Sequence, residues 1–207
     1  MDDTADRRSA FEAALGNEYF ALSGMRASSI AEASTRASLF FTTLTGTVLA
    51  LGFLAGSTDA VAPVAYAALP TVIILGFLSF LRLVEIAVED VRALQAINHI
   101  RAYYGQLVPE AHEYFPPPGR VQAINALLDT GAHRSPWRTL LTISATVGVV
   151  NTLVASAALA FALGHVGLPI AVAVACSAVV AIVIGWALWR YQTHRFIAAV
   201  GPDTARE

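Results

Sequence analysis

Four long apolar runs limit most strongly what this chain can fold into. They cover residues Leu39–Gly56, Pro63–Val84, Thr139–Leu163 and Pro169–Trp189. A helix needs roughly 20 apolar residues to cross the hydrocarbon layer of a bilayer, and each run is close to that length. Charged residues make up only 14% of the chain, well below the roughly 25% of a typical soluble domain. The sequence therefore predicts an all-α, polytopic membrane protein with four transmembrane helices.

The positions of the arginines predict how these helices are oriented. The short links at residues 57–62 and 164–168 contain no arginine, whereas all 13 basic residues lie in the remaining segments or, for Arg82, at their edge. Because basic residues favour the cytoplasmic side, we expect both termini in the cytoplasm. The expected parts are a juxtamembrane amphipathic helix (1–38), a first transmembrane hairpin (39–84), a cytoplasmic helical segment (85–138), a second transmembrane hairpin (139–189) and a cytoplasmic tail (190–207).

Residues 7–38 show helical spacing but are too polar to cross a membrane. One face carries apolar and aromatic side chains, namely Phe11, Leu15, Tyr19 and Leu22. This pattern predicts an amphipathic helix that lies on the membrane or on a partner helix. Gly16 and Gly24 are points where that helix could break, since glycine costs about 1 kcal/mol relative to alanine in a helix.

The second apolar run continues into the cytoplasmic segment without a stop signal. No proline occurs between residues 71 and 108, so we expect one helix from residue 63 to about residue 105, with roughly half of it outside the membrane. This outer half carries an apolar seam at alternating steps of three and four, interrupted by Asp90. Such a seam is typical of coiled coils and needs a second helix to cover it, either the N-terminal helix or a second protomer. The candidate oligomer seam consists of Ile86, Ala93, Ile97, Ile100, Tyr104 and Leu107.

Hydroxyl residues are concentrated on one face of the first apolar run. This face continues a strip of small residues and could line a water-filled path, with Ser38, Thr42, Thr45 and Leu49 as the pore-lining candidates. The alternative is helix packing, in which each hydroxyl bonds to its own backbone one turn earlier.

Charged residues cluster where the second run reaches the cytoplasm. Arg82 is followed at helical steps by Glu85, Glu89 and Arg92, and Arg36 lies at a similar distance before the first run. Charges at this depth are costly unless they are paired, so a functional role is a reasonable hypothesis. In an oligomer they would form a cytoplasmic charge ring that selects ions. The alternative is an interfacial network that fixes the depth of the helix.

The last two runs carry small residues at steps of four, which predicts close helix packing. These residues are Ser144, Gly148, Thr152 and Ser156 in the third run and Ser177, Ala181 and Gly185 in the fourth. Asn151 is the most polar side chain of the third run, and it either bonds to another helix or faces a cavity.

No pattern in the sequence points to catalysis. Motifs typical of serine hydrolases, nucleotide-binding loops and zinc proteases are missing, and a single cysteine, Cys176, excludes a disulfide framework. The spans carry no carboxylate of the kind that coupled transporters use, and a net charge of −2 gives no basic footprint for nucleic acid. We therefore expect no enzyme, no cofactor, no metal site and no nucleic-acid partner.

Several short motifs resemble a group of bacterial integral membrane proteins that is common in actinobacteria. They lie at Asn17–Phe20, Ser34–Phe40, Arg82–Glu85, Ile97–Tyr104 and Pro109–Phe115. The resemblance implies a four-helix protein of the bacterial plasma (inner) membrane and no particular activity. The first half is also similar in layout to SLATT domains, in which two spans are flanked by cytoplasmic helices and which are thought to act as pore-forming effectors in bacterial conflict systems.

Together these features favour an oligomeric integral membrane protein that acts as an ion channel or a pore-forming membrane effector. Its expected partners are membrane lipid and further copies of the same chain. One alternative is a non-conducting membrane scaffold whose cytoplasmic helices recruit a protein partner. Another is a membrane protein that binds a lipid or a small molecule between its two hairpins.

Overall fold

The computed structural model describes residues 3–56, 58–107 and 142–200, and apart from short turns this part of the chain is helical. It forms four helices, α1 (Asp3–Leu54), α2 (Thr58–Leu107), α6 (Ile143–His165) and α7 (Ile170–Val200). All four are long and apolar enough to cross a membrane, as the four apolar runs predict. Residues 108–138 of the expected cytoplasmic segment and the tail from residue 201 lie outside the described residues.

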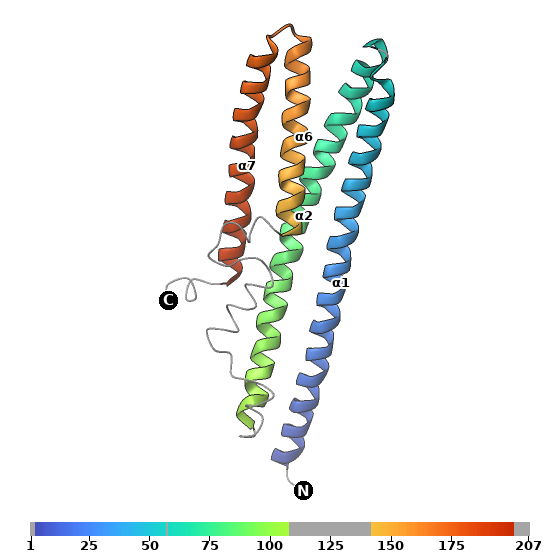
Figure 1. The fold of residues 1–207 in the computed structure, drawn as a ribbon. Helices are drawn as coiled ribbons and strands as arrows, with labels where there is room; N and C mark the ends of the chain where they lie inside the picture. The colour runs from blue at the N-terminus through green and yellow to red at the C-terminus, as the bar shows by residue number, and fades with distance from the viewer. Residues whose placement is uncertain (1–2, 57, 108–141, 201–207) are drawn as a thin grey trace.

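The four helices form two antiparallel hairpins that lie side by side (Figure 1). Both hairpin turns lie at the same end of the molecule, where Tyr66 of α2 contacts the ring of Phe161 near the end of α6. At the other end the α1–α2 hairpin extends well beyond α6 and α7 (Figure 1). Helices α2 and α6 each pack against all three of the other helices, and the contact of α2 with α1 is the most extensive of these contacts.

Helix α1 is continuous from the expected juxtamembrane helix into the first apolar run, and neither Gly16 nor Gly24 breaks it. Its N-terminal half is held along α2, where the rings of Phe11 and Tyr103 meet edge to face and the hydroxyl of Tyr104 donates to the carbonyl of Glu12 at 2.9 Å. Packing against a second helix supplies most of the stability of a helix in a protein. The packing of α1 on α2 therefore outweighs the cost of the two glycines. Of the two predicted positions of residues 7–38, on the membrane or on a partner helix, the structure shows the second.

Helix α2 runs without interruption through the expected membrane boundary at Val84, and its 50 residues span about 75 Å. The seam on its outer half is covered within the chain. Ile97 is only 3% exposed, and Ile86, Ala93 and Ile100 are also buried, while Tyr104 and Leu107 are half-buried. The seam was expected to pack against the N-terminal helix or against a second protomer, and the structure shows the N-terminal helix. These residues are therefore not a free surface for a second protomer, which corrects their assignment as an oligomer seam.

The two hairpins meet through a core in which small residues allow large ones to enter. Phe40, Phe80, Val84 and Val147 are fully buried between α1, α2 and α6. Gly148 of α6 lies against the ring of Phe80, so that a Cβ at this position would come within 2.9 Å of it. The close approach predicted for this face of α6 therefore serves contact with α2 as well as with α7.

Asn151 of α6 makes the interhelical bond that was one of its two expected roles. Its side-chain amide donates to the carbonyl of Ile73 in α2 at 3.2 Å. Its Oδ1 is buried with no hydrogen-bond partner in the described part of the chain, and it lies against Gly76, where a Cβ would collide with it and with Phe40. Glycine is required there because Asn151 occupies the space of a side chain.

Most of the small residues predicted to pack α6 against α7 are buried, but Gly185 does not serve close packing, because a Cβ there would meet nothing within 4 Å. The hydroxyl of Ser156 donates to the backbone carbonyl of Ser177 at 3.1 Å, which fixes the contact of the two helices directly. The remaining members are Ser144, Gly148, Thr152 and Ser177, which are buried, and Ala181 and Gly185, which are half-buried.

Helices α6 and α7 differ from the third and fourth apolar runs at their ends. Helix α6 begins at Ile143 and not at Thr139, because Thr142 has an extended backbone and caps the helix by accepting a bond from the amide of Ala145. Helix α7 continues past Trp189 to Val200, since its Phe196 packs against Val88 and Val91 of α2. The first part of the expected tail is therefore helical.

Candidate functional site

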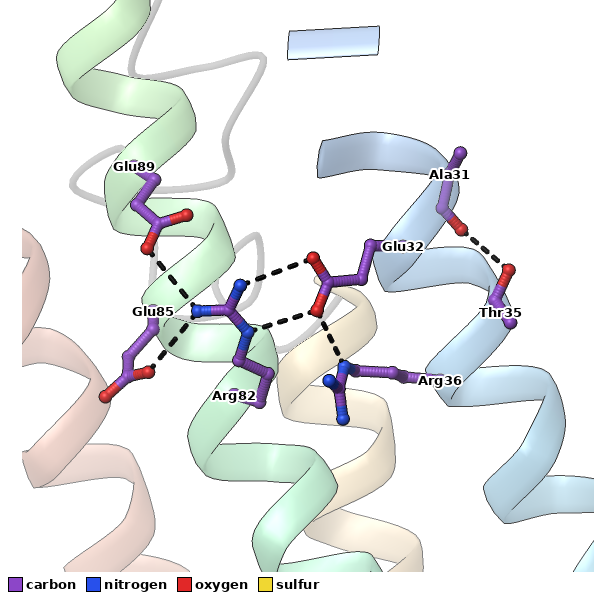
Figure 2. A network of polar contacts seen from close by, with 7 residues as sticks. All are labelled: Ala31, Glu32, Thr35, Arg36, Arg82, Glu85 and Glu89. Atoms are coloured by element: carbon purple, nitrogen blue, oxygen red, sulfur yellow. Dashed lines mark hydrogen bonds and ion pairs between the residues drawn. The ribbon is translucent and has the colours of Figure 1, made fainter. Parts of the chain in front are cut away.

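A cluster of charged side chains joins α1 and α2 close to the expected membrane boundary (Figure 2). It contains Glu32 and Arg36 from α1 and Arg82, Glu85 and Glu89 from α2. Their side chains are one third to one half exposed, so the cluster lies on a flank of the helix pair and not in its core. We treat this cluster, called the boundary cluster below, as the candidate functional site.

Arg82 is the centre of the boundary cluster (Figure 2). Its Nε and Nη2 donate to the two carboxylate oxygens of Glu32 at 3.1 and 3.3 Å, which is a two-pronged contact between helices. Its Nη1 lies 3.7 Å from Glu85, one turn further along its own helix, and 3.4 Å from Glu89, two turns further along. The planar guanidinium of arginine suits such multiple contacts, because its donors have a fixed fork geometry.

Glu32 accepts from two arginines at once. In addition to Arg82, the Nε of Arg36 donates to Glu32 Oε1 at 2.9 Å. These hydrogen bonds, that of Arg82 first and that of Arg36 second, hold the pKa of the Glu32 carboxyl below its ordinary value. Glu32 is therefore an anion at neutral pH, and its contacts with Arg82 and Arg36 make the boundary cluster an electrostatic clamp between the two helices.

A second ion pair joins the same two helices further from the boundary. Arg26 of α1 donates to both carboxylate oxygens of Asp90 at 2.7 and 3.1 Å. The two side chains are 27% and 13% exposed, respectively, so this pair is more buried than the boundary cluster. Asp90 is the residue that interrupts the apolar seam of α2, and its partner on α1 explains why a charge is tolerated there.

Four of the five residues predicted for the charge ring come together within one chain: Arg36, Arg82, Glu85 and Glu89. Arg92 is exposed and does not join them in the described part of the chain. Glu32 is the central anion that the sequence reasoning missed. Its spacing of four from Arg36 was a signal, because such pairs meet on a helix surface. Its contact with Arg82, 50 residues away, needed the fold.

The pore-lining candidates do not lie inside the chain. Ser38, Thr42, Thr45 and Leu49 are all exposed on α1, and none of them belongs to the hydrophobic core that α1 forms with α2 and α6 in the described part of the chain. Neighbouring hydroxyls bond to their own backbone, that of Thr43 to the carbonyl of Leu39 and that of Thr47 to the carbonyl of Thr43. No such bond is found for Ser38, Thr42 or Thr45 within the described part of α1.

The residues that the structure describes contain no group of three or more histidine, cysteine, aspartate or glutamate side chains that could hold a metal ion. Comparison with protein-family profiles, curated proteins and solved structures finds no match to this chain. The features of the described chain that bear on function are the two ion-pair sites and the surfaces that the helices leave uncovered.

Proposed function

We propose that this chain is a multi-pass protein of a bacterial plasma membrane, with both termini in the cytoplasm, that works as a non-conducting scaffold. In this proposal the cytoplasmic parts of α1 and α2, residues 6–37 and 85–107, form a stiff stalk that presents a surface to a protein partner. The single observation that carries the proposal is that α1 fills the apolar seam of α2 within one chain. The stalk is thus complete without a second protomer.

The uncovered surfaces of the helices support placement in a membrane. Large apolar side chains such as Phe53 of α1 and Ile170 and Ile182 of α7 are more than 70% exposed. Leaving such surface in water costs about 25 cal/mol for each Å², and extended patches of this kind mark membrane or protein contact. Lipid removes this cost along α7 and the C-terminal half of α1.

The contacts between α1 and α2 support a stiff stalk. Residues 85–107 of α2 would reach about 35 Å beyond the membrane boundary. Along this length α1 and α2 are joined by the boundary cluster, by the Arg26–Asp90 pair and, near the end, by Arg101 donating to the hydroxyl of Tyr19 at 3.2 Å. Two helices bonded at several levels bend less than one, which suits a device that holds a partner at a set distance.

Photo-crosslinking in the native host tests the scaffold. A photoreactive residue is placed at exposed stalk positions, Ala13 on α1 or Gln95 on α2, with Val174 on the outer face of α7 as the matched control. The proposal predicts one recurrent adduct with a soluble protein from stalk positions and none from Val174. It fails if the stalk positions give only unreacted monomer.

A second function, a pore formed by several copies, is favoured by the exposed hydroxyls of Ser38, Thr42 and Thr45. Hydroxyls without a bonding partner are costly in hydrocarbon, and a ring of α1 helices would turn them toward water. Ion flux across liposomes containing the purified chain decides between the two functions. The pore requires flux that a T42L/T45L variant abolishes and a V48L control preserves, whereas the scaffold predicts no flux above that of protein-free liposomes.

A further inference from the structure

The last turns of α7 combine positive charge with exposed aromatic rings. Helices α6 and α7 contain no aspartate or glutamate between residues 143 and 200, while α7 carries Arg190 and Arg195, both exposed. Arg26 and Arg82 both bond to carboxylates on a facing helix. By contrast, no ion pair to a carboxylate is found for Arg190 or Arg195 in the described part of the chain.

The geometry of this segment separates an outer, basic face from an inner face that holds it in place. Trp186, Arg190 and His194 follow each other at steps of four, so they lie along one exposed face. The guanidinium carbon of Arg190 lies 5.6 Å from the centre of the Trp186 ring, a cation–π contact that fixes the arginine beside the ring. Gln192 and Phe196 are buried toward the other helices, so α7 cannot turn its charges inward.

We propose that the last turns of α7 bind the phosphate headgroups of anionic phospholipids, through Arg190 stacked on Trp186 and through the exposed Arg195 on another side of the helix. Charge complementarity supports this site: Arg190 and Arg195, which have no carboxylate partner among the described residues, are exposed at the level where the exposed tryptophans and Tyr191 favour the headgroup layer. A basic residue near an anionic membrane surface favours binding, and an arginine stacked on a ring leaves its donors free for phosphate oxygens. The inference rests on the proposed membrane insertion.

Tryptophan quenching by brominated lipid tests the site in the full chain. A W137F variant, in which Trp186 and Trp189 are the remaining tryptophans, is reconstituted with phosphatidylglycerol or phosphatidylcholine brominated near the headgroup end of the acyl chains. We expect the anionic lipid to be enriched around these tryptophans about fivefold or more over the zwitterionic lipid. A factor of about five is the gain in binding that one arginine contributes near an anionic membrane surface. High salt should lower this ratio toward one.

Two variants with the same loss of charge separate the site from a general charge effect. R190Q/R195Q should bring the ratio of the two lipids close to one, while R7Q/R8Q, at the far end of α1, should leave it unchanged. Circular dichroism checks that both variants stay helical, and the salt dependence of the W137F chain provides a readout that needs no arginine substitution.

The possible failures of this experiment are distinguishable. Equal quenching by the two lipids would overturn the headgroup site and leave membrane insertion standing. Quenching by neither lipid would overturn membrane insertion of α7 and with it the proposed function. Loss of selectivity in both arginine variants would show a response to net charge alone, and the site would again be rejected.

Discussion

Arg26 and Arg82 each donate to both carboxylate oxygens of an acid on the opposite helix, but their surroundings differ. The boundary cluster is half open to solvent, which screens its ion pairs and keeps their contribution to stability small. The Arg26–Asp90 pair lies in the seam itself, where removing one partner leaves the other charge poorly solvated. At the scale of single residues, the buried pair should therefore matter more for stability than the larger cluster.

A double-mutant cycle on Arg26 and Asp90 measures this difference. We expect R26A or D90A alone to lower the free energy of unfolding by about 1–3 kcal/mol, because each removes the two-pronged ion pair from a site that is less than one third exposed. The coupling energy between the two substitutions should be about 1–2 kcal/mol. The exposed Arg8–Glu12 pair serves as control, with a coupling of at most about 0.5 kcal/mol. Equal couplings at both pairs would contradict the burial argument.

The stability of the α1–α2 contact should depend on pH through Glu32. Its pKa is lowered in the folded chain by Arg82 and Arg36, so its stabilising effect is present at neutral pH. That effect is lost as the pH falls from the ordinary glutamate range, about 4.3, through the lower folded value. Unfolding midpoints measured between neutral and acid pH should fall less steeply for E32Q than for the native chain. Substitution of the exposed Glu18 should leave the slope unchanged, and an identical slope for E32Q would contradict the clamp.

At the scale of the helices, small residues serve two different purposes. Gly76 and Gly148 lie where helices touch, so each gives room to a large side chain of a neighbour. Gly24, Gly46 and Gly52 have open space where a Cβ would be. Position on the helix, and not residue type alone, therefore decides what a glycine contributes.

Alanine substitutions at two of these positions should have opposite signs. G76A forces a Cβ against Asn151 and Phe40, which overpacks the contact between the hairpins and should cost about 1–3 kcal/mol. G46A meets nothing, and it should stabilise α1 by up to about 1 kcal/mol because alanine is the better helix former. Thermal unfolding in detergent measures both, and a destabilised G46A chain would indicate an unseen contact on that face of α1.

Much of the helical layout could be predicted from the sequence, because the apolar runs and the lack of a stop after Val84 are local signals. The continuity of α1 was harder to predict, since Gly16 and Gly24 are weak helix formers and only contact with α2 offsets them. The partners of Arg26 and Arg82 are 64 and 50 residues away. Periodicity predicts an apolar seam on each helix separately. It does not indicate whether the helix that packs on this seam belongs to the same chain or to another copy.

At the scale of the whole molecule, both hairpin turns lie at one end and the stalk at the other (Figure 1). This arrangement requires the links near residues 57–62 and 164–168 to share one side of the membrane. In intact cells of a C176S background, single cysteines at Ala62 or Gly164 should react with a membrane-impermeant maleimide. Cysteines at Asn17 or His99 on the stalk should react only after lysis. Labelling of a stalk position in intact cells would reverse the proposed orientation.

The account depends most on the pairing of α1 with α2 inside a single chain. Cysteines replacing Phe11 and Tyr103, whose ring centres lie 5.4 Å apart, can be joined by a short bismaleimide in a C176S background. Nitrogen-15-labelled and unlabelled chains are mixed in detergent, reconstituted together and crosslinked, and the joined peptides are weighed by mass spectrometry. The account predicts peptide pairs that are wholly light or wholly heavy. A large fraction of mixed pairs would show that the seam joins different chains, and the self-paired stalk would be wrong.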